Sequence, residues 1–371
     1  MIEETMLKAE ENAVYQLRSL YAEYGYQPYK MSKFEEYDLY ARNKDFLVSD
    51  GIITFTDTNG KLMALKPDVT LSILKNSKDV PHCTQRVYYN ENVYRISGET
   101  HEYKEIMQTG LECMGIIDFF NTMEVLELAA RSLSTLSKQY VFEISHMAFL
   151  KGLLQEAGAG EVFDEAITGC IDEKNPHEIR RICGKYNVSE DVTEKLVRFT
   201  GIYGDRNKVL SELENLCSTD EMESALSELR NISAALDGTE FDKQVRFDFS
   251  LVNDMKYYDG IVFQGFIEGI PEVVLSGGQY DRLLSRMGRE SGGIGFALYL
   301  DLLDYLHCNT RKYDVDVVLL YDPDADFAAL KKAADELRKN GDTVSVQQEI
   351  PAHLNARRLM KFNGKEVVSI G

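Results

Sequence analysis

Four polar side chains on two neighbouring segments could supply acceptors for the ammonium group of a free amino acid. Asp68 and Thr70 follow a predicted strand. Gln108 and Glu112 stand four residues apart with Gly110 between them, so in a strand they point to the same face. An ammonium group needs two or three acceptors at converging directions, and carboxylates serve best. The four side chains could therefore supply the oxygens that an ammonium group needs.

A purely structural interpretation stays open for the two carboxylates. Asp68 and Glu112 could cap a helix or form ion pairs with the nearby Lys66 and Lys104. For either carboxylate taken alone, that is the commoner role. The binding hypothesis therefore depends on all four polar side chains occurring together.

Hydrophobic periodicity predicts the elements that must position these side chains. Asp57–Gly60 is a strong hairpin turn, because Asn-Gly accepts positive φ. A helix is expected at 69–76, and a polar loop at 98–101 joins two longer strands. The strands are expected at 46–48, 52–55, 61–65, 84–97 and 103–116.

The following residues predict further strands around a helical insertion. Apolar residues alternate over 245–251, which predicts a half-buried antiparallel strand. Residues 147–240 have the helical period throughout. Other helices are expected at 4–24, 118–138 and 278–288, and other strands at 257–267 and 271–276.

Residues 313–371 predict a small α/β appendage with a mostly parallel sheet. Its strands are expected at 315–320, 343–347 and 366–370, and its helices at 324–339 and 352–361. We therefore infer a core in two parts, 1–146 and 241–310, a helical insertion at 147–240, and the appendage at 313–371.

Charge excludes one class of function. The chain has 371 residues, with 41 Lys and Arg against 61 Asp and Glu, so its formal net charge is −20. Residues 151–240 hold 10 basic and 19 acidic residues, a net −9. A broad surface for nucleic acid is disfavoured, because phosphate contacts need positive charge.

Cysteine spacing and the N-terminal residues indicate a cytoplasmic protein. The six cysteines lie far apart without the spacing of a zinc site, so we expect neither a metal nor a disulfide framework. Met1–Thr5 is acidic and lacks the pattern of a signal peptide. No apolar run approaches the ~18–20 residues of a membrane span.

Four ordered segments resemble the histidyl-tRNA synthetase family. Residues 63–70 are similar to its L-R-P-E-x-T turn, and residues 94–112 to its second class II motif, F-R…Y-R-Q-F-x-Q-x-G-x-E. Residues 276–283 are similar to G-G-R-Y-D-G-L, and 295–298 match the start of its third motif. The resemblance covers about residues 1–310. It implies an α+β fold with a class II aminoacyl-tRNA synthetase-like antiparallel sheet flanked by helices.

This resemblance implies a histidine site. The four polar side chains occupy the positions for the α-ammonium group, and Tyr257 and Tyr258 those for the imidazole. Arg95 keeps the arginine of the second motif, and we expect it to contact the histidine carboxylate instead of a nucleotide. The predicted site residues are Asp68, Thr70, Arg95, Gln108, Glu112, Tyr257 and Tyr258.

The positions that bind ATP in the family are changed. The second-motif loop becomes Ile96–Glu102, with carboxylates where ATP would need cations. Leu302 replaces the phosphate-binding arginine, and Tyr299 replaces a glycine and crowds the adenine slot. Asn253 replaces the arginine that assists histidine activation. Losing one such group costs ~10²–10³ in rate, so we expect no synthetase activity.

A histidine-binding half without an ATP-binding half resembles the family of ATP phosphoribosyltransferase regulatory subunits, which are paralogues of the synthetases. That resemblance implies a non-catalytic protein of the first step of L-histidine biosynthesis. It implies a short-form catalytic subunit as the partner, histidine as the ligand, and a homodimer within a hetero-oligomer. It implies no cofactor.

Two other interpretations stay open. The chain could be a divergent histidyl-tRNA synthetase, or a free-standing amino-acid sensor with another partner. Residues 313–371 resemble the start of the synthetases' anticodon-binding domain, but they hold 8 basic and 10 acidic residues. RNA recognition normally uses a clustered basic face. We therefore expect these residues to serve structure or docking, and not to bind tRNA.

Overall fold

The computed structural model describes residues 9–43, 51–79, 83–96, 102–252, 257–307 and 313–370. The chain divides into two compact units, Met1–Leu306 and His307–Gly371. Each unit contains its own cluster of buried apolar side chains.

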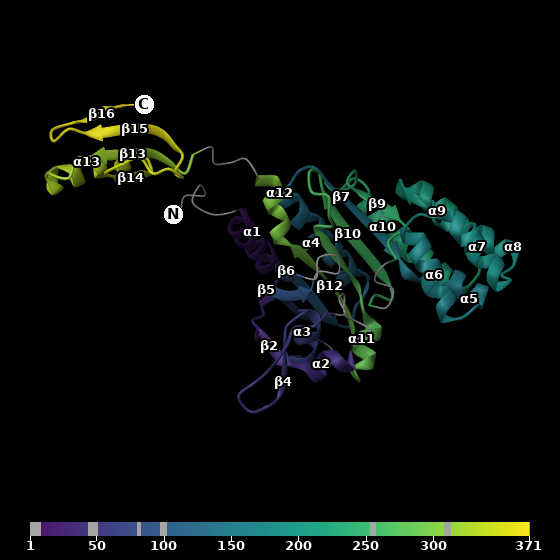
Figure 1. Cartoon of the computed structure of the whole chain (residues 1–371). Coiled ribbons are helices and arrows are strands. Elements are labelled where there is room, and N and C mark those ends of the chain that lie inside the picture. Colours follow the sequence, from purple (N-terminus) through teal and green to yellow (C-terminus); the bar gives the residue numbers. More distant parts are fainter. Residues whose placement is uncertain are drawn as a thin grey trace. The chain divides into compact units, whose positions relative to one another are not determined.

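A nine-stranded sheet forms the centre of the larger unit (Figure 1). Its strands follow the order β1 (Gln27–Pro28), β5 (Gln85–Ile96), β6 (Tyr103–Gly115), β12 (Gly292–Tyr299), β11 (Leu275–Gln279), β10 (Ile261–Ile267), β7 (Tyr140–His146), β9 (Val245–Asp248) and β8 (Tyr203–Gly204). The pairs from β5 through β7 are antiparallel. This architecture confirms the predicted α+β class.

One prediction about the sheet was wrong. The strand expected at 245–251 is β9, which runs parallel to β7 and antiparallel only to the short β8. Parallel neighbours need a long crossover connection, and the helical segment between β7 and β9 provides it.

Two helices, α1 (Ala9–Glu23) and α4 (Phe119–Leu136), pack together against this sheet. Ala13, Leu17 and Tyr21 are buried and stand four residues apart, so they lie on one face of α1. Gly25 follows α1 with a φ of +80°, which suits a helix end.

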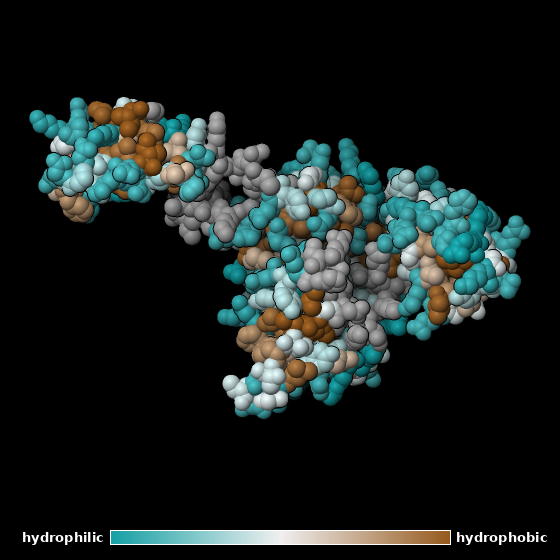
Figure 2. Space-filling view, in the orientation of Figure 1, coloured by the Kyte–Doolittle hydropathy of each residue, from teal (hydrophilic) through white to brown (hydrophobic). Residues whose placement is uncertain are grey.

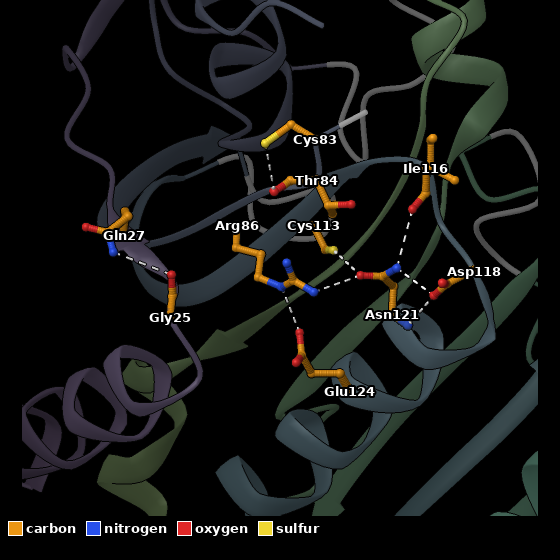
Figure 3. Close-up of polar contacts among 10 residues, drawn as sticks. All are labelled: Gly25, Gln27, Cys83, Thr84, Arg86, Cys113, Ile116, Asp118, Asn121 and Glu124. Atoms are coloured by element: carbon orange, nitrogen blue, oxygen red, sulfur yellow. Dashed lines mark hydrogen bonds and ion pairs between the residues drawn. The ribbon is translucent and has the colours of Figure 1, made fainter. Parts of the chain in front are cut away.

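A polar cluster fastens β5 and β6 to α4 (Figure 3). Arg86 of β5 donates to the carboxylate of Glu124 and to the side-chain oxygen of Asn121, both at 2.9 Å. Asn121 donates to Asp118, the N-cap of α4, at 2.6 Å. The thiol of Cys113 on β6 faces the same amide oxygen, and burial raises its pKa to about 12.

A small three-stranded sheet adjoins the far end of β5, where the N–H of Tyr94 donates to the carbonyl of Lys66 at 2.9 Å. The predicted turn Asp57–Gly60 is confirmed, with a φ of +79° at Gly60. The strand predicted at 46–48 lies outside the described residues. The elements are β2 (Phe34–Glu36), β4 (Leu62–Leu65), β3 (Thr54–Thr56), α2 (Tyr37–Arg42) and α3 (Thr70–Asn76).

Residues 147–240 fold almost entirely into helices, and their buried faces join the core of the sheet. Side chains cap several of them; Ser189, for example, accepts the N–H of Val192. In Figure 2 their visible surface is mostly hydrophilic. The helices are α5 (Met147–Ala157), α6 (Glu161–Asp172), α7 (Pro176–Tyr186), α8 (Glu190–Phe199), α9 (Arg206–Glu214) and α10 (Asp220–Leu236).

The strand β11 begins four residues later and ends three residues later than the predicted 271–276, which shortens the helix that follows it. Gly278 pairs with Val262 and Gly295 inside the sheet, so α11 (Asp281–Arg286) begins three residues later than expected. After β12 come the 3₁₀ helix η3 (Leu300–Leu303) and α12 (Asp304–His307).

Over residues 313–370, the smaller unit consists of a four-stranded sheet and the helix α13 (Phe327–Lys339). The helix predicted at 352–361 was wrong, because those residues contain a strand. Leu359 and its neighbours favour helices intrinsically, but pairing with strands on both sides overrides that weak preference. The strands follow the order β14 (Val344–Gln347), β13 (Val315–Tyr321), β15 (Ala356–Phe362) and β16 (Val367–Ser369).

Candidate functional site

All seven predicted site residues line one pocket in the larger unit. They come from the start of α3, from β5 and β6, and from the segment that precedes β10. The space between the lining side chains is about 540 Å³ when its open mouth is included. The lining residues are Asp68, Val69, Thr70, Tyr89, Arg95, Gln108, Glu112, Tyr257, Tyr258, Ser276, Tyr280, Gly295, Phe296, Ala297 and Tyr299.

Strand register explains why Gln108 and Glu112 meet in this pocket. Glu112 lies opposite Gly295 of β12, and Gln108 lies opposite Tyr299. Residues directly opposite in a sheet share a face. The predicted period of two therefore places both side chains over the same part of the sheet.

Glu112 is the most enclosed carboxyl group of the pocket, with 2% of its surface exposed. It accepts hydrogen bonds from the Thr70 hydroxyl at 2.6 Å and from the Tyr280 hydroxyl. Burial raises its pKa to about 8. Its two donors are neutral hydroxyl groups, so the alternative of an ion pair with Lys104 does not describe this carboxyl group.

Asp68 has a capping role as well as a place in the pocket. Its carboxylate accepts the N–H of Leu71 in the first turn of α3 at 2.7 Å, so the structural alternative holds in part. Burial raises its pKa despite this bond. Lys66 instead pairs with Glu91, at 2.9 Å. Asp68 therefore couples the start of α3 to the pocket.

Arg95 brings a guanidinium group to the same pocket. Its Nε donates to the carbonyl oxygen of Pro67 at 3.1 Å, which holds the side chain against the turn that carries Asp68. A fixed guanidinium is well suited to a carboxylate ligand, because it offers several donors in one plane.

Aromatic side chains form the wall of the pocket. The rings of Tyr257 and Tyr258 lie edge to face with centroids 4.8 Å apart, and Tyr280 lies 6.0 Å from Tyr257. Burial raises the pKa of Tyr257 and of Tyr280, so both phenols stay neutral and can donate hydrogen bonds.

Gly295 and Gly110 leave room for the polar ends of the Glu112 and Tyr89 side chains. A Cβ on Gly295 would collide with the Glu112 carboxylate, and one on Gly110 would lie 2.6 Å from the Tyr89 hydroxyl. Any larger residue would push these side chains away, so both positions require glycine.

Of the positions that the resemblance relates to ATP binding, the structure describes Tyr299 and Leu302. Tyr299 lines the pocket, and Leu302 is 9% exposed within the core. Asn253 and residues 97–101 of the second-motif loop lie outside the described residues.

The sequence analysis did not assign Tyr89, Ser276 or Tyr280 to the site. Tyr280 and Ser276 lie in the segment 276–283 that carried part of the family resemblance, which was the available signal. Tyr89 stands six residues before Arg95 on β5, so both side chains lie on the same face of the strand. A strand tyrosine is usually a packing residue, however, and the sequence alone did not assign it to the site.

Chemically, the pocket offers buried carboxyl, amide and hydroxyl groups, one guanidinium and an aromatic wall. Such a set can hold a small zwitterion with an aromatic or polar side chain. Among the residues that the structure describes, no group of three or more His, Cys, Asp or Glu is arranged to bind a metal ion.

The family model described as histidyl-tRNA synthetase matches residues 2–303. The chain belongs to the histidyl-tRNA synthetase family. Among its curated relatives, the ATP phosphoribosyltransferase regulatory subunit of Oceanobacillus iheyensis is 28% identical over 295 residues, which are 79% of this chain and 72% of that protein. The predicted likeness to both groups is thus confirmed.

Solved structures agree with this fold. An ATP phosphoribosyltransferase regulatory subunit/histidyl-tRNA synthetase from Bacillus halodurans C has a TM-score of 0.72 at 24% identity, covering 91% of this chain and 88% of that one. A chain of the ATP phosphoribosyl transferase (HisG:HisZ) complex from Thermotoga maritima has a TM-score of 0.62 at 22% identity, covering 78% and 96%. At these identities the likeness confirms the class II synthetase-like fold alone.

Proposed function

We propose that this protein is a non-catalytic regulatory subunit of ATP phosphoribosyltransferase that binds histidine in its synthetase-like pocket. One observation carries the proposal. The seven positions assigned to histidine meet in one pocket. By resemblance, Tyr299 and Leu302 occupy the positions at which the synthetases have a glycine and an arginine for ATP. The protein would thus keep ligand binding without amino-acid activation.

The geometry supports a specific orientation of histidine. Asp68, Thr70, Gln108 and Glu112 would receive the α-ammonium group, and Arg95 the carboxylate. The two adjacent tyrosines at 257 and 258 would then face the imidazole. Each charged group of the ligand would meet a partner of opposite or complementary character, as burial requires.

Calorimetry with histidine tests the site directly. We expect binding by the wild-type protein and at least tenfold weaker binding by Asp68→Ala and Glu112→Ala. Glu194→Ala is the matched control, because Glu194 is an exposed carboxylate of the helical insertion that pairs with Arg180 and does not line the pocket. No heat at millimolar histidine, or equal affinity in all variants, would refute the assignment.

The partner in this proposal is a short-form catalytic subunit, with this chain forming a homodimer within a cytoplasmic hetero-oligomer. The names of the relatives support it, and the Thermotoga maritima assembly is described as a complex of HisG and HisZ. Co-purification with such a subunit and stimulation of its activity are the expected results. A folded, histidine-binding protein that leaves that subunit unaffected would instead be a sensor for another partner.

A divergent histidyl-tRNA synthetase is the second candidate, because the matching family model carries that name and the Bacillus halodurans relative carries both. Histidine-dependent exchange between ATP and pyrophosphate distinguishes the two. We expect no exchange above background. Exchange by the purified protein would favour the synthetase.

A further inference from the structure

The pocket wall continues directly into a short segment that touches the helical insertion. Residues 257–260 run from the two wall tyrosines to the start of β10. The carbonyl of Gly260 accepts the N–H of Met147, the first residue of α5, at 2.9 Å. The carbonyl of Asp259 accepts the ammonium of Lys151, one turn further along α5, at 3.2 Å. This helix therefore holds the wall segment at two successive carbonyls.

The opposite side of the same segment is anchored in the sheet. The N–H of Asp259 donates to the carbonyl of Gln279 at 3.0 Å. Its carboxylate accepts the N–H groups of Asp281 and Arg282 at 3.1 and 2.6 Å, which caps α11. Asp259 is thus hydrogen-bonded on one side to β11 and α11 and on the other side to α5, directly next to Tyr258.

Within the insertion, α5 packs closely against α10. A Cβ on Gly152 would lie 2.6 Å from the Met222 sulfur of α10, so the two helices are in close contact. At the start of α5, His146 accepts the N–H of Ala148 through Nδ1 and meets Glu228 of α10 through Nε2 at 3.3 Å. Lys151 lies between these two contacts in sequence.

The partly buried surroundings of Lys151 strengthen its hydrogen bond to the carbonyl oxygen of Asp259. Burial lowers the pKa of its ammonium group, while the neighbouring Asp259 carboxylate opposes that change. A partly dehydrated ammonium group donates a stronger hydrogen bond than one in water.

We propose that Lys151 is a positioning residue that fixes the tyrosine wall and couples occupancy of the pocket to the packing of α5 against α10. This inference rests on the proposed function, in which histidine is the ligand. Linkage makes the coupling reciprocal. If histidine binding stabilises the packing of α5 against α10, then a change at Lys151 that destabilises this packing must weaken histidine binding.

Three variants of the full chain test it. Lys151→Met removes the donor and keeps the length of the side chain, and Lys151→Arg keeps a cationic donor. Lys195→Met is the matched control, because Lys195 also contacts α5, through Glu156 at 2.6 Å, but belongs to α8. We expect about tenfold weaker histidine binding for Lys151→Met, and changes below threefold for the other two.

Hydrogen exchange supplies a readout that a merely structural role would not move. In the wild type, histidine should slow amide exchange in α5 and α10, and in Lys151→Met this protection should disappear while the melting temperature without ligand stays close to wild type. If histidine binds the wild type without protecting α5, the inference fails and the proposed function stands. Unchanged affinity in folded Lys151→Met also overturns it. No histidine binding by the wild type refutes the proposed function itself.

Discussion

At the scale of single residues, Glu112 gives the folded protein a stability that depends on pH. Its carboxyl group is buried between the hydroxyls of Thr70 and Tyr280, and its pKa is raised from 4.5 to about 8 by burial. The folded protein therefore holds this proton more tightly than the unfolded chain. The resulting stabilisation is fully present below about pH 4.5 and is lost as the pH rises through about 8.

Glu112→Gln should remove this pH dependence, because the amide is neutral at every pH. Without ligand, we expect the melting temperature of the wild type to fall more between pH 6 and pH 9 than that of the variant. Near pH 5 the two should be similarly stable. Thermal unfolding followed by circular dichroism at several pH values measures the difference. Parallel curves would show that Glu112 is already ionised in the folded protein at neutral pH.

Gly295 should be sensitive to the smallest substitution. In Gly295→Ala the new methyl group collides with the Glu112 carboxylate and with the backbone of Leu111. Overpacking of this kind costs about 1–3 kcal/mol, and we expect histidine affinity to fall at least tenfold. Thermal unfolding and calorimetry measure the two effects.

The control for this substitution is Gly169→Ala. Gly169 lies inside α6, and a Cβ there meets nothing within 4 Å. Alanine in a helix is favoured over glycine by roughly 0.5–1 kcal/mol, so this variant should be as stable as the wild type or more so. Equal behaviour of the two variants would contradict the close approach at Gly295.

At the scale of elements, the strand pair β5–β6 was the part of the fold best predicted from sequence. Its period of two placed Gln108 and Glu112 on one face, and the structure agrees. Tyr89 was missed because a strand tyrosine is usually a packing residue. Ser276 was missed because it joins the pocket through the pairing of β11 with β12, far from β5 and β6 in the sequence, which no local pattern reports. The same non-local pairing turned the predicted helix around Leu359 into a strand.

The cluster around Arg86 should contribute measurably to the attachment of α4. In Arg86→Met, Glu124 and Asn121 lose their 2.9 Å hydrogen bonds in a partly buried place. Leaving such groups unpaired costs roughly 1–2 kcal/mol. Chemical denaturation measures this loss. Arg180→Met is the control, because the exposed pair with Glu194 should contribute little. Equal losses in the two variants would contradict a special role for the cluster.

At the scale of the whole molecule, the negative charge is unevenly distributed. Residues 151–240 carry a net −9, whereas residues 313–371 carry 8 basic and 10 acidic residues. A partner that contacts the helical insertion therefore needs positively charged groups to match it. The pocket is different, because burial raises the pKa of both its carboxyl groups, Asp68 and Glu112, so the overall charge of −20 does not describe it.

The division into two units makes a prediction about which part of the molecule binds histidine. All residues that line the pocket lie between 68 and 299, inside the unit Met1–Leu306, and the smaller unit has a separate core. A chain that ends at Leu306 should therefore bind histidine within twofold of the full-length affinity by calorimetry. Glu112→Ala in the shortened chain should weaken histidine binding at least tenfold, as in the full chain, which shows that the heat comes from this pocket. If the shortened chain stays folded but no longer binds histidine, the prediction is wrong, and residues 307–371 are required for binding.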